Sequence, residues 1–174
     1  PGQTVNVEGL GSAGLCAAAY ILHKYGDPDA EHAINVAKEA IDGAIEAEKN
    51  GTRSLVLLHN IIAVEYMVKM GFEEYRQQAE VWGDRILSMQ AGDGTFTWLD
   101  FQVRNMEALL RAYEITGKER FLEGFNKALQ TLEYTEDGVR WKGNLVAFGS
   151  YPFWGGVDLT FLPYLGRMDV VDLF

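Results

Sequence analysis

Apolar residues recur at intervals of three and four along most of the first 133 residues, which is the period of an amphipathic α-helix. Short segments rich in glycine, asparagine and aspartate separate these runs, and such residues favour turns. The pattern predicts six helices, over residues 10–25, 29–49, 53–70, 73–90, 99–116 and 118–133. The first, third and fifth are the more apolar, whereas the second, fourth and sixth are amphipathic and more charged on one face.

Glycines follow these helices at a nearly constant interval along the sequence. Gly26, Gly71 and Gly117 follow the first, third and fifth helices and stand about 45 residues apart, where a C-terminal glycine ends a helix. The turns after the other three helices contain glycines at a similar spacing, namely Gly51, Gly94 and Gly138. A fixed period of this size indicates a repeated supersecondary unit. The sequence therefore predicts an all-α fold of repeated helical hairpins, each with an apolar inner helix and an amphipathic outer helix.

The C-terminal part of the chain departs from this helical pattern. Residues 138–141 and 144–148 are predicted to form a small strand pair or an ordered loop. A short inner helix over residues 158–166, limited by Pro163, would begin a further hairpin. We therefore expect about three and a half hairpins in a single domain over residues 1–174, as a fragment or domain of a longer protein.

Two motifs carry a resemblance to a known superfamily. Residues 113–122, YEITGKERFL, resemble the turn from an inner to an outer helix in the sugar-acting members of the α/α toroids, and residues 90–96, QAGDGTF, resemble the loop that returns to the next inner helix. With the hairpin period over about residues 10–166, the chain resembles part of an α/α toroid. This resemblance implies two concentric layers of helices and a carbohydrate-active function, as in a glycoside hydrolase or a related sugar-processing enzyme.

The sequence also supports two hypotheses other than a carbohydrate-active function. Gln90, Gly94 and Phe96 also match part of the repeat of the terpenoid cyclases, although the aspartate-rich catalytic motif of those enzymes is absent from the sequence. The chain has about half the hairpins of a full toroid. A non-catalytic helical repeat that binds a peptide or a partner subunit, and an isoprenoid cyclase-like domain, are therefore the alternative hypotheses.

In a ring of hairpins, the loops that enter the inner helices share one rim, and aromatic and acidic residues gather in these loops. Apolar sugar faces stack on aromatic rings, carboxylates accept hydroxyl hydrogen bonds, and a pair of carboxylates is needed for glycosidic acid/base chemistry. The candidate catalytic carboxylates are Asp100, Asp158 and Glu8. The candidate substrate-binding residues are Trp98, Gln102, Arg104, Tyr151, Trp154 and His59.

Each candidate also has a purely structural interpretation. Asp100 and Asp158 stand where a carboxylate satisfies the exposed N–H groups of a helix N-terminus. Glu8 can simply be solvated, and the tryptophans can belong to a core. His59, within an apolar helix, fits a hydrogen-bonded core histidine. Gly9, Gly11 and Gly14 have the spacing of a dinucleotide-binding loop, but no βαβ unit surrounds them, so we expect close packing of a small-residue helix start.

The composition argues against several classes of binding partner. The formal charge of -10 and the pI of about 4.7 argue against nucleic acid or an anionic membrane as the main partner. No uninterrupted apolar run is long enough to predict a membrane span. The histidines show no metal-ligand spacing, so neither a metal nor a cofactor is expected, and Cys16 should be a buried, inert thiol. We expect a carbohydrate substrate, with a second copy or the rest of the same protein completing the ring.

Overall fold

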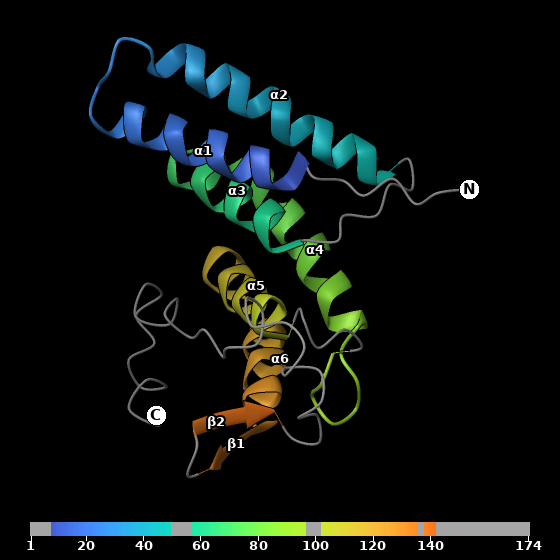
Figure 1. The fold of residues 1–174 in the computed structure, drawn as a ribbon. Helices are drawn as coiled ribbons and strands as arrows, with labels where there is room; N and C mark the ends of the chain where they lie inside the picture. Colours follow the sequence, from blue (N-terminus) through green and yellow to red (C-terminus); the bar gives the residue numbers. More distant parts are fainter. Residues whose placement is uncertain (1–7, 50–56, 97–101, 136–137, 142–174) are drawn as a thin grey trace. The chain divides into compact units, whose positions relative to one another are not determined.

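The fold was obtained as a computed structural model that describes residues 8–49, 57–96, 102–135 and 138–141 (Figure 1). The described helices are α1 (Glu8–Lys24), α2 (Ala30–Lys49), α3 (Leu57–Lys69), the 3-10 turn η1 (Glu73–Tyr75), α4 (Arg76–Ser88), α5 (Gln102–Thr116) and α6 (Glu119–Leu129). A two-stranded hairpin, β1 (Leu132–Thr135) and β2 (Gly138–Trp141), follows them. The expectation of a mainly helical fold is confirmed, whereas the arrangement of the hairpins in a toroid stays a prediction.

The chain divides into two compact units, Pro1–Gly83 and Asp84–Phe174. Their boundary falls within α4. Each unit is described by itself, and the expectation of one domain over residues 1–174 stays a prediction.

The first unit has α1 at its centre, because α1 packs against both α2 and α3. The buried side chains of this core include Cys16, Ala19, Ala37, Ile41, Ile61, Val64 and Met67. Cys16 is fully buried, and this burial raises the pKa of its thiol to about 12. The expectation of a buried thiol is confirmed, and the raised pKa disfavours the reactive thiolate.

The helix ends explain the regular spacing of the glycines. Gly26 and Gly71 both have left-handed backbones, with φ of 66° and 95°. After α1 the N–H of Asp27 donates to the carbonyl of Leu22 (2.9 Å), and after α3 the N–H of Phe72 donates to Met67 (3.1 Å). Both are Schellman ends, in which the residue after the glycine bonds back five positions.

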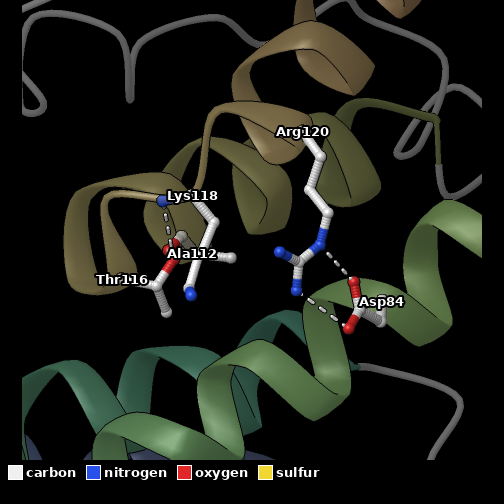
Figure 2. A network of polar contacts seen from close by, with 5 residues as sticks. All are labelled: Asp84, Ala112, Thr116, Lys118 and Arg120. Carbon is white, nitrogen blue, oxygen red and sulfur yellow. Dashed lines mark hydrogen bonds and ion pairs between the residues drawn. The ribbon is translucent and has the colours of Figure 1, made fainter.

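Gly117 ends α5 in a related way. Its φ is 67°, and its own N–H donates to the carbonyl of Tyr113 at 2.7 Å. Figure 2 shows the adjoining contacts, in which the Thr116 hydroxyl donates to the carbonyl of Ala112 and accepts from the N–H of Lys118. The predicted glycine ends of these three helices are confirmed.

In the second unit α5 packs against α6. Its buried side chains include Ile86, Phe96, Met106, Leu109, Leu110, Phe121 and Phe125. Arg120 of α6 also forms a bidentate pair with Asp84 of α4, with N–O distances of 2.7 and 3.0 Å (Figure 2). Both side chains are at least a third exposed, so this pair contributes little to stability beside the apolar core.

The end of α6 differs from the sequence prediction. The helix stops at Leu129 instead of continuing to residue 133, because the Thr131 hydroxyl donates to the carbonyl of Ala128 (2.6 Å) and the following residues favour a strand. In the described part of the chain, β2 pairs antiparallel with β1. The predicted partner segment, residues 144–148, lies outside the described residues.

The start of α1 also differs from expectation. Gly11 and Gly14 are exposed, and a Cβ atom added to either would meet no atom within 4 Å. The expected close packing of the small-residue helix start is therefore provided by Ser12 and Ala13, which are buried, and not by Gly11 and Gly14.

Candidate functional site

The described residues include only part of the predicted rim. Glu8 and Gln102 are the first residues of α1 and α5, while Arg104 and His59 are half-buried within α5 and α3. The remaining candidates, Trp98, Asp100, Tyr151, Trp154 and Asp158, lie outside the described residues. The structure therefore brings no two of the predicted catalytic carboxylates together in the part that it describes, and their roles stay predictions.

The turn before residues 97–101 is described up to Phe96. Gln90 and Phe96 form a β-bridge across the turn. The Gln90 amide nitrogen donates to the carbonyl of Gly94 (3.1 Å) and to that of Gly124 in α6 (2.8 Å). One side chain thus closes the turn and fastens it to α6, which sets the point at which the chain enters residues 97–101.

The carboxylate inside this turn has a structural role. Asp93 accepts hydrogen bonds from the Thr95 hydroxyl (2.7 Å) and the Thr95 N–H (3.0 Å). These bonds hold the pKa of Asp93 below its usual range, since they stabilise the ionised carboxyl group. Asp93 is thus a turn-forming residue, and it provides a control for tests of the predicted catalytic carboxylates.

The structure also reveals a groove in the first unit that the sequence analysis missed. We call it the Tyr75 groove. It has a volume of about 570 Å³ and is lined by Asp42 and Ile45 of α2, Glu74 and Tyr75 of η1, and Gln77, Gln78 and Val81 of α4. Its lining contains two carboxylates and no basic residue, while Ile45 and Val81 supply apolar surface.

Two side-chain hydrogen bonds link α2 to η1 and α4. The Tyr75 hydroxyl donates to Asp42 Oδ1 at 3.0 Å, and the indole N–H of Trp82 donates to Glu48 Oε2. Tyr75 is buried, and this burial together with the Asp42 carboxylate raises its pKa, because both disfavour a phenolate.

The lining suits a ligand with several hydrogen-bonding groups and some apolar surface. Carboxylates accept bonds from hydroxyls or amines, and the side-chain amides of Gln77 and Gln78 can donate as well as accept. Because Asp42 and Tyr75 are 33 positions apart, helical periodicity could not have paired them.

The contact between Tyr75 and Asp42 predicts a specific dependence of stability on pH. The folded pKa of Tyr75 lies above its unfolded value of about 10, so the stabilisation is complete below pH 10 and decreases as the pH rises through the folded pKa. Between pH 8 and 11 the wild type should lose on the order of 1 kcal/mol more than the Tyr75→Phe variant. Urea unfolding at both pH values measures this difference, and equal losses in the two proteins would contradict it.

Three further observations bear on metal binding, membrane insertion and relationship to known proteins. The described residues contain no group of three or more histidine, cysteine, aspartate or glutamate side chains that could hold a metal ion. No helix among them combines the length and apolar character needed to cross a membrane. No family model, curated protein or solved structure matches this chain.

Proposed function

We propose that this chain is a carbohydrate-active domain of repeated helical hairpins, related in function to glycoside hydrolases. The observation that carries the proposal is the recurrent connection between helices. Gly26, Gly71 and Gly117 each adopt a left-handed conformation, about 45 residues apart, and the first two make equivalent hydrogen bonds. Such recurrence is what a hairpin array requires, and it supports the resemblance to the sugar-acting α/α toroids.

The proposed chemistry uses the loops that enter the inner helices. Asp100 and Asp158 act as the acid/base pair, with Glu8 as a further carboxylate. Aromatic side chains form the surface on which a sugar ring stacks, and polar side chains contact its hydroxyls or a uronate. The stacking residues are Trp98, Tyr151 and Trp154, and the polar residues are Gln102, Arg104 and His59.

Hydrolysis of a panel of oligosaccharides, followed by mass spectrometry of the products, tests this proposal on the full chain. The Asp100→Asn and Asp158→Asn variants should each lower turnover by about 10²–10⁴-fold, since each removes a proton-transferring group. Asp93→Asn is the matched control, because Asp93 is exposed and bonds to Thr95 within its own turn. It should leave turnover unchanged. An equal loss in all three variants, or no turnover by the wild type, contradicts the proposal.

A second candidate function is a non-catalytic module that binds a partner chain. The Tyr75 groove favours it, because this groove offers carboxylates, amides and apolar surface, and its lining contains none of the predicted catalytic carboxylates. Saturable binding without turnover, weakened by Glu74→Gln or Gln78→Ala, would support this candidate over the enzyme.

A further inference from the structure

The Tyr75 groove gathers negative charge. Its lining comes from three elements, α2, η1 and α4, and it contains the carboxylates of Asp42 and Glu74 and no basic side chain. Burial is the main cause of the raised pKa of Tyr75, and the charges of both carboxylates add to it, so both act on the Tyr75 hydroxyl. The groove therefore presents a negative potential to a ligand.

The nearest basic side chains do not neutralise this charge. The structure shows no ion pair between either carboxylate of the groove and another described residue. Glu73, by contrast, is paired with Arg76 at 2.7 Å. Lys38 stands one helical turn before Asp42 on α2, but its ammonium lies over the Phe72 ring, 3.7 Å from the ring centroid. Within the part of the chain that the structure describes, the charge of the groove thus lacks a cation.

The other lining groups suit a peptide segment that carries a cation. Ile45 and Val81 offer apolar surface, on which the aliphatic stem of a lysine can lie while its ammonium reaches the carboxylates. The side-chain amides of Gln77 and Gln78 can donate to and accept from peptide groups. The volume of about 570 Å³ lies within the usual range for sites of drug-sized ligands, so the groove has room for more than one side chain.

We propose that the Tyr75 groove binds a lysine-bearing segment of a partner chain, with the lysine ammonium at Asp42 and Glu74. An ammonium is a compact charge with three donors, which suits two carboxylates from different elements. The Tyr75 hydroxyl holds Asp42 Oδ1 at 3.0 Å, and a carboxylate has further lone pairs that can accept from the ammonium. The formal charge of -10 also favours encounter with a basic partner. This inference rests on the second candidate function, partner binding, and is independent of carbohydrate activity.

Titration of the ¹⁵N-labelled full chain with synthetic peptides, followed by two-dimensional NMR, tests this proposal. The probes are capped seven-residue peptides with one central lysine and varied aliphatic neighbours. Each has a control peptide in which Nε-acetyllysine replaces the lysine. Lysine peptides should bind saturably and shift the amide signals of the groove residues. Their acetylated counterparts should bind at least 5-fold more weakly, because acetylation removes the charge.

Variants of the groove locate the contact. Glu74→Gln and Asp42→Asn should each weaken binding of the lysine peptide about 2–5-fold, as expected for the loss of one exposed ion pair. Glu73→Gln is the matched control, because Glu73 is adjacent and exposed but lies outside the lining and pairs with Arg76. It removes the same charge and should leave the dissociation constant unchanged. Circular dichroism checks that all three variants keep their helices.

Four results would overturn the proposal. They are no saturable binding of any lysine peptide, equal binding of the acetylated peptides, equal losses in Glu73→Gln and Glu74→Gln, and binding of n-butylamine as tight as that of the peptides. Equal binding of both kinds of peptide at the groove would retain partner binding and remove only the role of the lysine. Oligosaccharide turnover is measured separately, so its presence or absence leaves these outcomes distinct.

Discussion

Replacing Gly94 by alanine is expected to destabilise the second unit by about 2–5 kcal/mol. Gly94 has φ of 95°, and a left-handed backbone costs an L-residue with a Cβ atom about 1–2 kcal/mol. The added Cβ would also overlap the carbonyl oxygen and carbon of Lys127, which belong to the backbone of α6. Relief of this overlap must move the turn or the helix, and such overpacking typically costs a further 1–3 kcal/mol, roughly.

Gly117→Ala is the matched control for this prediction. Gly117 is also left-handed, at φ of 67°, but a Cβ there would meet no atom within 4 Å. This variant should therefore lose only the conformational term of about 1–2 kcal/mol. Urea unfolding of both variants and the wild type measures the free energies. Similar losses in the two variants would show that the approach of the turn to α6 does not restrict position 94.

The second large loss of stability is expected when Trp82 is replaced. This side chain is fully buried and its indole N–H donates to Glu48 at the end of α2. Trp82→Ala should destabilise the first unit by about 3–5 kcal/mol, since it removes a large buried ring and leaves a cavity. Trp82→Phe keeps most of the apolar contact and loses the donor, so its cost should be about 1–2 kcal/mol.

Val81→Ala provides the control at the neighbouring position. Val81 is 51% exposed, and its truncation should change stability by less than about 0.5 kcal/mol. Unfolding is best followed by far-UV circular dichroism, because the substitutions at position 82 change the tryptophan fluorescence itself. If Trp82→Ala costs no more than Val81→Ala, the contact between α2 and α4 contributes little to the stability of the first unit.

The helices themselves were largely predictable, because helical periodicity is a local property of the chain. Helical spacing places six apolar residues on one stripe of α2, and the structure buries three of them fully and the other three in part; they are Ala37, Ile41 and Ala44, and Ala33, Ile34 and Ile45. The glycine ends after α1, α3 and α5 were predictable for the same reason, since a left-handed residue is required where the helix stops. The end of α6 was not, because Thr131 and the pairing of β1 with β2 compete with continued helix.

The sites were much less predictable. No local signal relates Tyr75 to Asp42, or Gln90 to the carbonyl of Gly124, because each pair joins residues more than thirty positions apart. The predicted catalytic carboxylates, by contrast, were chosen from loop chemistry and the toroid resemblance, and they stay predictions.

The sequence by itself determined where the helices lie and which of their faces are apolar, since both depend on residues within a few turns of each other. Only the tertiary structure decided which apolar faces are covered. The inward side of α1 is buried against α2 and α3, whereas Leu15 and Ile21 on its other side remain exposed. Periodicity treats these two sides alike, and only the packing of distant segments distinguishes a buried side from an exposed one.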